Sequence, residues 1–577
     1  MAQAQETTSP TSTVIPIPPP AKNMSRETTL SPSSPSKQAT GLDGIRQKLQ
    51  PLLLYVVSTA QFLDIVNGAS VAVAILPIAK DLHFSVPQMT WIINAYTIAF
   101  AGLLLFSGRL GDLFGHRRVF LFGLFWFATW ALVVSFSTSP IMFVISRALQ
   151  GVGAANTVPS AMALIATTYP AGPERTKAFS IFAAFGGLGA VVGILMAGGL
   201  ISSIGWTWIF RISSIAAYLL LGLGFLVIPS APPKSVKPKI DYIGAATATL
   251  GVTGIVYYIT TGVEDGWAVG KTLPVFIVGV LLIAGFIFVE SKVQSPLMPL
   301  RIWKSKRFSS SVILAFVQMA MFQGVIYFAN MVFQEVYQWS AIQTALGFLV
   351  HSLLAVVVFT ALGRIMPRLH LKPLILVGFL LRCGTALLFS FIDEHKSYWR
   401  FAFPAFIIHI FGVGFSMLPI QITAIRDADN KDQGLVGAIY NTGLQLGAPF
   451  GLAILNVIAV SANRDVLDSG VHSGPTLMKG YRNAFYGMIA LGLFGFVLTA
   501  IILPWDKPQR PAQKPTAENK DLEVGAPVEV NEEKMLDGDE EALGSSSFSS
   551  SSKVESDANT IATQIDAADT YKEQNKA

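Results

Sequence analysis

Fourteen long apolar runs alternate with short polar segments along the chain. They cover residues 52–78, 90–109, 119–137, 140–166, 178–203, 206–228, 242–262, 273–291, 309–334, 342–362, 373–392, 401–424, 434–460 and 483–504. Each run is near the ~20 residues that a helix needs to cross a bilayer core about 30 Å thick. Only helices and closed barrels satisfy their backbone groups in lipid. The pattern therefore predicts an all-α polytopic membrane protein with fourteen transmembrane helices.

Lysine and arginine are shared unevenly between the two sides of these spans. With the N-terminus placed in the cytosol, the inner loops hold eighteen of them and the outer loops seven. The positive-inside rule and the even number of spans then place both chain ends in the cytosol. The only glycosylation sequon, at Asn23, would stay unmodified there. We expect the plasma membrane, with the vacuolar membrane as the alternative.

Composition excludes several classes of protein and of functional site. Hydrophobic residues make up 52% of the 577 and charged residues only 13%, whereas soluble domains carry about 25% charged residues. The single cysteine, Cys383, excludes an internal disulfide and a cysteine-based metal site. The seven histidines are scattered, so we expect no metal, no cofactor and no enzyme activity. The net charge of +6 reflects basic loops and an acidic tail, so it does not indicate nucleic-acid binding.

Composition shifts predict a modular chain. Residues 1–50 are rich in Ser, Pro and Thr, without an apolar run that would form a signal peptide. Such segments bury too little apolar surface to fold alone. The predicted parts are a disordered cytosolic tail at 1–50, a six-helix bundle at 51–228, a linker with two additional transmembrane helices at 229–307, a second six-helix bundle at 308–504, and a disordered acidic and Ser-rich tail at 505–577.

A faint repeat relates the two bundles. Gly151-Val152-Gly153 followed by Pro159 recurs as Gly412-Val413-Gly414 followed by Pro419. Parallel repeats of this kind build transporters whose halves rock about a site near the bilayer midplane.

The loop between the second and third runs is short and basic. Its pattern is formed by Gly108, Asp112, Gly115, Arg117 and Arg118. The glycines permit a sharp turn, and the arginines mark the cytosolic side. A loop that only anchors the chain to anionic lipid has no need for Asp112. The plainer interpretation, a connecting loop with cationic anchors, remains open at this point.

The first run contains an acid. Asp64 and Asn67 are three residues apart and share a helical face. A charged side chain at this depth costs about 2.5–3.5 kcal/mol by insertion scales, so it should face a cavity or a partner. Such a carboxyl group can take up and release a proton as a cavity changes sides. The alternative is a structural carboxylate that is permanently paired.

The fourth run contains a cation. Arg147 and Gln150 share a face, and a buried guanidinium needs an acid or several carbonyl oxygens. At 1.5 Å per residue, Asp64 lies about 18 Å from the cytosolic end and Arg147 about 10 Å higher. Direct contact between them is therefore open, as is snorkelling of Arg147 to the outer interface. In the fifth run, Gly189, Gly193 and Ala197 recur every four residues and predict close helix packing.

These segments together resemble a known family. The residues concerned are Asp64 with Leu76-Pro77, Asp112 with Gly108 and Gly115, Arg147 with Gln150-Gly151, and Trp206-Thr207-Trp208-Ile209-Phe210. They are similar to the fourteen-span drug:proton antiporter family of the major facilitator superfamily, in its fungal form. The resemblance covers the first six spans, and the second half mainly by layout. It implies the major facilitator fold, with two six-helix bundles and an inserted helix pair.

The resemblance also implies roles for individual residues. It assigns Asp64 and Arg147 to proton coupling, and the basic loop to a conformational latch. The latch would set Asp112 against a helix start near Gln433-Gly434, where the positive end of a helix dipole suits an anion. The chain departs from the family in the fifth span, because Gly193 is followed by Ile194 instead of proline. This departure weakens the argument for export over uptake.

In this fold, spans one, four, nine and twelve would line the transport path. The substrate-binding residues predicted on that basis are Asn67, Gln150, Gln318, Gln323, Tyr327, His409 and Gln421. Each polar group taken alone is equally typical of a hydrogen bond between helices. Arg382 falls in a peripheral span and has no predicted partner.

The sequence thus favours a monomeric, proton-coupled exporter of small amphipathic organic compounds that works by alternating access. Its expected partners are small-molecule substrates, protons and the lipid bilayer. The alternative is an importer or carrier of a small polar or inorganic solute with the same fold. A membrane enzyme would need clusters of acids or histidines at the water interface, and a sensor would need a recognisable cytosolic domain; neither is visible.

Overall fold

The computed structural model describes residues 52–170, 173–229, 241–265, 267, 270–293, 296, 298–366, 369–393, 398–426, 433–463 and 474–505. All of them belong to one compact unit, Met1–Pro511. The predicted tail at 1–50, nearly all of the tail at 505–577, and much of the loop preceding the inserted helix pair lie outside the described residues.

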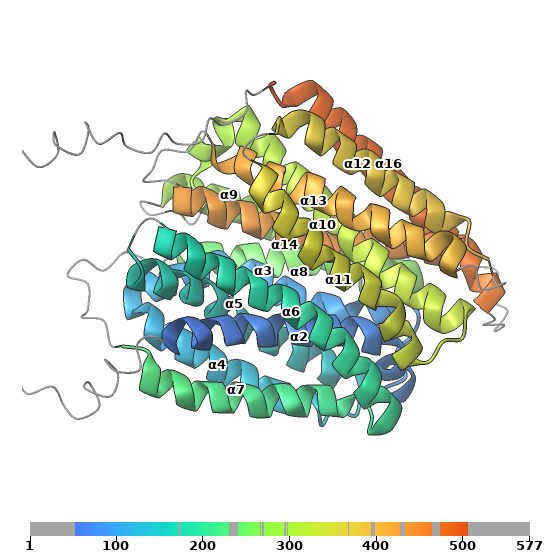
Figure 1. The fold of residues 1–577 in the computed structure, drawn as a ribbon, viewed down its shortest axis with the longest axis horizontal. Coiled ribbons are helices and arrows are strands. Elements are labelled where there is room, and N and C mark those ends of the chain that lie inside the picture. Colours follow the sequence, from blue (N-terminus) through green and yellow to red (C-terminus); the bar gives the residue numbers. More distant parts are fainter. Residues whose placement is uncertain are drawn as a thin grey trace, which may run out of the picture. The chain divides into compact units, whose positions relative to one another are not determined.

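Every regular element among the described residues is helical (Figure 1). The α-helices are α2 (Leu53–Asp81), α3 (Trp91–Phe114), α4 (His116–Val134), α5 (Pro140–Thr168), α6 (Pro173–Ser203), α7 (Thr207–Val227), α8 (Tyr242–Asp265), α9 (Leu273–Lys292), α10 (Lys306–Met331), α11 (Ala341–Ile365), α12 (Leu371–Ser390), α13 (Phe403–Ile425), α14 (Gln433–Ala462) and α16 (Gly474–Ile502). In the described part of the chain, fourteen helices are long and apolar enough to cross a membrane, which confirms the predicted number.

Local sequence explains several helix ends. The Ser139 side chain accepts a hydrogen bond from the Met142 backbone N–H, and Pro140 follows it at the first helical position of α5. Ser340 and Gln343 form a reciprocal capping box at the start of α11. Between α3 and α4, Gly115 has a φ of 89°, a backbone conformation that suits glycine. This glycine makes the one-residue turn between the two helices possible.

Glycines on two helices allow equivalent close contacts in the two halves. A Cβ atom added to Gly189 of α6 would lie 2.8 Å from the Phe62 carbonyl oxygen of α2, and one added to Gly193 would lie 2.6 Å from the Val66 carbonyl oxygen. In the second half, Gly447 of α14 approaches the Phe316 backbone of α10 in the same way. The predicted stripe on α6 therefore lies against α2, and Ala197 at its end is fully buried.

A matched pair of substitutions tests this contact. We expect Gly193→Ala to destabilise the protein by about 1–3 kcal/mol, because the added methyl group has no room against the α2 backbone. Gly199→Ala, on the same helix, meets nothing within 4 Å and should stabilise α6 by about 0.5–1 kcal/mol. Thermal unfolding of the purified variants in detergent measures the difference. Equal midpoints for the two variants would contradict the packing argument.

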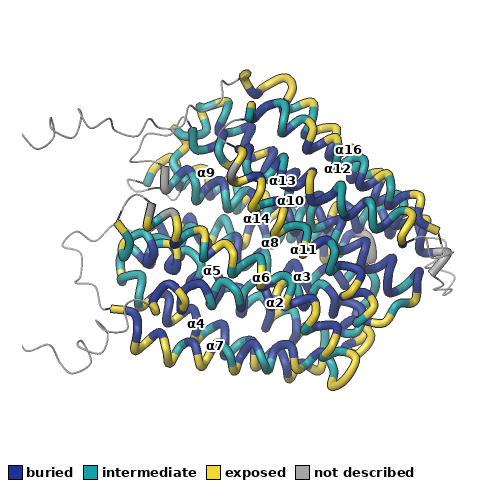
Figure 2. The backbone as a smooth tube through the Cα atoms, in the orientation of Figure 1, coloured by how far each residue is buried: buried dark blue, intermediate teal, exposed yellow. Residues whose placement is uncertain are grey.

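The inserted pair, α8 and α9, packs together and lies beside α3 and α14 through α8. The exposed apolar side chains of the outer helices include Leu219 on α7, Leu281 on α9 and Ile501 on α16. Figure 2 shows such exposed positions along the outward faces of the helices. Because a soluble protein does not expose apolar surface on this scale, these faces are suited to lipid. The protein is an integral, multi-pass membrane protein.

The two bundles share their largest hydrophobic core at one end, and a smaller cluster joins Ile98 of α3 to Val252 of α8 and Ala453 of α14. We call the end where α2 begins and α16 finishes the termini end, and the opposite one the far end. At the far end, a single cluster joins side chains such as Ile75 and Phe143 of the first half to Phe333 and Phe485 of the second. At the termini end the halves have separate clusters, and Leu105 of α3 packs across onto the second-half cluster.

Two hydrogen bonds reinforce the far end. The Gln334 Nε2 group, in the π-helical turn Val332–Val336 after α10, donates to the Val73 carbonyl oxygen at 2.8 Å. Asn456 Nδ2 on α14 donates to the Pro87 carbonyl oxygen at 3.4 Å. The halves are therefore closed against each other at the far end.

Candidate functional site

Three helices of the first bundle bring an acid, a tyrosine and an arginine together. Tyr96 of α3 donates a hydrogen bond from its hydroxyl group to Asp64 Oδ1 of α2. The guanidinium carbon of Arg147, on α5, lies 4.4 Å from the centroid of the Tyr96 ring. Tyr96 thus contacts Asp64 with its hydroxyl group and Arg147 with its ring face. A cation over an aromatic ring is attracted by the ring quadrupole, and more strongly where water is excluded.

Amide oxygens fix the position of Arg147. Its Nη1 group donates to Asn67 Oδ1 at 2.7 Å and to Gln150 Oε1 at 2.6 Å. Arg147 is 1% exposed, and Asn67 and Gln150 are fully buried. The guanidinium therefore lies inside the bundle and does not reach the outer interface. Because Asn67 is one turn beyond Asp64 on α2, the arginine is tied to the same helix as the acid.

Asp64 and Arg147, both among the described residues, do not form a direct ion pair within 4.0 Å. The residue that connects them, Tyr96, was not predicted from the sequence. A possible signal was Gly151, one turn after Arg147. A Cβ atom at that position would collide with the Tyr96 carbonyl oxygen, so the glycine permits α5 to approach α3 at the tyrosine.

The site retains unused donors. Arg147 Nε, Asn67 Nδ2 and Gln150 Nε2 are buried and have no hydrogen-bond partner in the described structure. Buried polar groups are normally paired, and each one left unpaired costs about 1–3 kcal/mol. The cluster of Asp64, Asn67, Tyr96, Arg147 and Gln150, here called the acid–arginine site, can therefore bind water or a polar group of a ligand.

The basic loop has its own contacts. His116 Nε2 lies 3.7 Å from Asp112 Oδ1, and Arg117 Nη2 donates to the Phe225 carbonyl oxygen of α7 at 3.1 Å. Gly108 has open space around its α-carbon, and Arg118 is exposed. The side chains at 433 and 434, where the latch was predicted to end, lie outside the described residues. The latch role stays a prediction.

The predicted substrate-binding residues fall in separate places. Asn67 and Gln150 belong to the acid–arginine site. Gln318 and His409 are buried inside the second bundle. Gln323 is half-buried and Gln421 is exposed. The predicted set is therefore divided in this arrangement between two buried positions, one half-buried one and one exposed one in the second bundle, and the acid–arginine site in the first.

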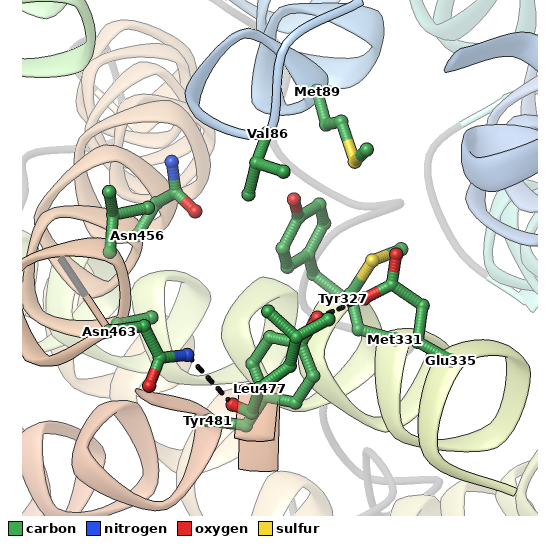
Figure 3. Close-up of a pocket in the computed structure, with 11 residues that line it drawn as sticks. Val86, Met89, Tyr327, Met331, Glu335, Asn456, Asn463, Leu477 and Tyr481 are labelled. Carbon is green, nitrogen blue, oxygen red and sulfur yellow. Dashed lines mark hydrogen bonds between the residues drawn. The ribbon is translucent and has the colours of Figure 1, made fainter. Parts of the chain in front are cut away.

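Tyr327 lines a pocket between the two halves at the far end (Figure 3). Its other lining residues are Val86, Met89, Met331, Glu335, Asn456, Ala459, Val460, Asn463, Leu477 and Tyr481. Tyr481 donates a hydrogen bond from its hydroxyl group to Glu335 Oε2, and Asn463 Nδ2 donates to the Leu477 carbonyl oxygen at 3.0 Å. Glu335 and Tyr481 were not predicted as site residues. The helical pattern places Tyr327, Met331 and Glu335 at four-residue spacing on one face of α10 and its π-helical extension, Val332–Val336.

The fourteen membrane helices of the described residues, in two bundles with an acid–arginine site inside the first, define a polytopic membrane transporter. The family model described as "Major Facilitator Superfamily" matches residues 57–452, so the chain belongs to this superfamily. It is similar to the cephamycin export protein CmcT of Amycolatopsis lactamdurans, with 31% identity over 459 residues, 78% of this chain and 92% of that protein. These findings confirm the resemblance to the fourteen-span drug exporters.

Two further comparisons bear on fold and function. The low affinity ammonium transporter of Saccharomyces cerevisiae is 28% identical over 430 residues, 70% of this chain and 80% of that protein. The crystal structure of a bacterial homologue of the human lysosomal transporter Spinster, in an inward-facing and unoccupied conformation, has a TM-score of 0.58 and 15% identity, and covers 79% of this chain and 99% of that one. At this identity the structural likeness concerns the fold alone.

Proposed function

We propose that the protein exports small amphipathic organic compounds in exchange for protons, with Asp64 as the proton-binding group. The observation that carries this proposal is the acid–arginine site, in which a membrane-embedded carboxyl group is linked to a fixed cation through Tyr96. Acids within membrane spans are rare and mark ion or proton pathways. Small-molecule substrates follow from membership of the superfamily.

The contacts suggest how a proton acts on the helices. The ionised Asp64 accepts a hydrogen bond from the Tyr96 hydroxyl group, and this bond links α2 to α3. Arg147 ties α5 to α2 through Asn67 and to α3 through the Tyr96 ring. Protonation of Asp64 removes the charge that holds this arrangement and changes the links among three helices. An equilibrium between two states shifts only when the two states bind the proton differently, and these links supply such a difference.

The arrangement of the cores fits one stage of alternating access. If the termini end is cytosolic, as the distribution of cations indicates, the closed far end faces the outside. The carrier would then accept its cargo from the cytosol. Rocking of the halves would break the far-end contacts of Gln334 and Asn456 and expose Asp64 to outside protons.

Inside-out membrane vesicles test the proposed function directly. With the vesicle interior made acidic, we expect uptake of amphipathic drugs against their gradient, and none when an ionophore collapses the pH difference. A panel of neutral, cationic and anionic compounds gives the substrate class. If the uptake of every compound is independent of the pH difference, proton exchange is ruled out.

A substitution at Tyr96 tests whether protonation of Asp64 acts on the helices through the Tyr96–Asp64 hydrogen bond. We expect Tyr96→Phe to reduce gradient-driven transport about tenfold or more, since a hydrogen bond to a charged group contributes about 1.5–3 kcal/mol. Tyr218→Phe is the matched control, because its hydroxyl group bonds only to Thr129 on an exposed face. The two variants are compared in vesicles at equal protein density. A Tyr96→Phe rate equal to that of Tyr218→Phe would remove Tyr96 from the coupling path.

A second candidate function is uptake or facilitated movement of a small polar solute. Two observations favour it: Ile194 stands in the fifth span where the exporters have proline, and one relative is a yeast ammonium transporter. The same vesicles distinguish the two functions. Methylammonium, used as an ammonium analogue, would move down its gradient in an importer, and drugs would not accumulate.

A further inference from the structure

A second buried arginine lies in the second bundle, outside the acid–arginine site. Arg382 of α12 is 1% exposed, and its Nη2 group donates to the Gln318 carbonyl oxygen of α10 at 2.6 Å. Its Nε and Nη1 groups are buried without a hydrogen-bond partner among the described residues. Arg147, in contrast, uses Nη1 to bind two amide oxygens. The charge of Arg382 is therefore far less compensated.

Two histidines of the same bundle stack on each other, and one of them lies one turn from a glycine that contacts Arg382. The rings of His351 on α11 and His409 on α13 are stacked with centroids 5.4 Å apart, and the Phe322 ring stacks on His409 at 5.8 Å. Both ring nitrogens of His409 and the Nε2 atom of His351 are buried without a partner in the described structure. A neutral imidazole carries one N–H donor and one acceptor nitrogen, so His409, with both ring nitrogens unpaired, adds one unused donor.

Packing holds the group together. Gly412 of α13, three residues after His409, faces the stem of Arg382: a Cβ atom added there would lie 2.7 Å from Arg382 Cγ. His409 therefore shares the face of α13 that meets Arg382. Gln318 and Phe322 lie four residues apart on one face of α10. Four helices thus supply the second-bundle cluster, which we define as Gln318, Phe322, His351, Arg382 and His409.

The cluster lies at the depth where this fold holds its cargo. Gln318 is twelve residues from the start of α10 and Arg382 is eleven from the start of α12, or about 18 Å and 17 Å along the helices. Half of a hydrocarbon core is about 15 Å. The second-bundle cluster therefore lies near the midplane.

The donor set specifies the charge of a ligand. A buried guanidinium cannot lose its proton and requires acceptors, and no carboxylate lies within 4.0 Å of it among the residues that the structure covers. Uncompensated donors from Arg382 and the His409 imidazole would suit one anionic group. A helix-linking role alone would use only Nη2 and leave the other donors buried at a cost.

We propose that the second-bundle cluster binds a monoanionic group near the membrane midplane, with Arg382 as its main charge partner and His409 as a hydrogen-bond donor. The anion is either a free halide such as chloride or the carboxylate of an organic cargo. Binding at this site does not depend on Asp64, so it can be measured without a proton gradient.

The test uses the full-length protein, purified in detergent at fixed pH. Sodium chloride or sodium benzoate is titrated against sodium sulfate at constant ionic strength, and the thermal unfolding midpoint is followed, since a ligand that binds the folded state raises it. We expect a saturable rise with one of the two anions. The anion that raises the unfolding midpoint shows whether the cluster binds a free halide or an organic carboxylate.

Variants assign the binding to the cluster. Arg382→Gln and His409→Phe should each raise the apparent dissociation constant at least tenfold, whereas the exposed Arg400→Gln removes the same charge and should leave it unchanged. If Arg382→Gln does not fold, His409→Phe decides. The proposal is overturned if neither anion raises the wild-type midpoint, if the rise does not saturate, or if the folded cluster variants match Arg400→Gln.

Discussion

Replacing Asp64 by asparagine is expected to reduce gradient-driven transport at least a hundredfold while the protein stays folded. Asparagine has nearly the same shape and keeps an oxygen that can accept a hydrogen bond from the Tyr96 hydroxyl group. It cannot cycle between a neutral and a charged form. Packing around α2 is therefore preserved, and the exchange of a proton for cargo is lost. Transport is measured in inside-out vesicles with an imposed pH difference.

The control for Asp64→Asn is an aspartate-to-asparagine substitution at the last residue of the same helix, α2. Asp81 is exposed and accepts a hydrogen bond from Trp206 Nε1 at 2.8 Å. Asp81→Asn should transport at close to the wild-type rate. Substrate exchange without a pH difference should survive in both variants, which separates lost coupling from lost folding. Full pH-driven accumulation by Asp64→Asn would remove this residue from the proton path.

Arg147→Met should have the second-largest effect, on both transport and stability. The substitution removes the fixed cation and leaves two buried amide oxygens, of Asn67 and Gln150, without a donor. At about 1–3 kcal/mol for each unpaired group, we expect a loss of about 2–6 kcal/mol. Gradient-driven transport should fall about a hundredfold, because Tyr96 and Asp64 lose their link to α5. Thermal unfolding and vesicle transport are measured on the same preparation.

A combined variant separates the two effects of Arg147→Met. With Asn67→Leu and Gln150→Leu added, the unpaired amides are gone, and apolar replacement of a whole polar group can restore stability. Stability should recover while transport stays low. Arg211→Met, which removes an arginine that stacks on Phe136 and Trp208, is the control. Recovery of transport in the triple variant would show that Arg147 is structural only.

Much of the fold follows from hydrophobicity. The first run, predicted at 52–78, is α2 at Leu53–Asp81, and all fourteen predicted spans have a helix in their place. Bilayer thickness fixes the length of each run, so the count is secure even where ends differ by a few residues. The turn at Gly115 was also predictable, because a tight helix connection needs a residue that tolerates positive φ.

The site was less predictable because it depends on how three helices are rotated about their axes. The shared face of Asp64 and Asn67 follows from spacing on one helix, and so does that of Arg147 and Gln150. The pairing of Asn67 with Arg147 depends on how α2 and α5 meet. The position of Tyr96 between the acid and the cation depends on how α3 meets both of them. Glu335 and the second-bundle cluster involve residues from distant segments. No spacing pattern in the sequence reports their proximity.

Proton release measured during substrate exchange tests the central claim most directly. Purified protein is reconstituted into liposomes that contain a pH-sensitive dye, and substrate is added on one side without any imposed gradient. The account predicts that cargo movement drives protons the opposite way in the wild-type protein, and that Asp64→Asn moves cargo with no change in internal pH. Cargo movement without proton movement in the wild type, or unchanged proton movement in Asp64→Asn, would contradict it.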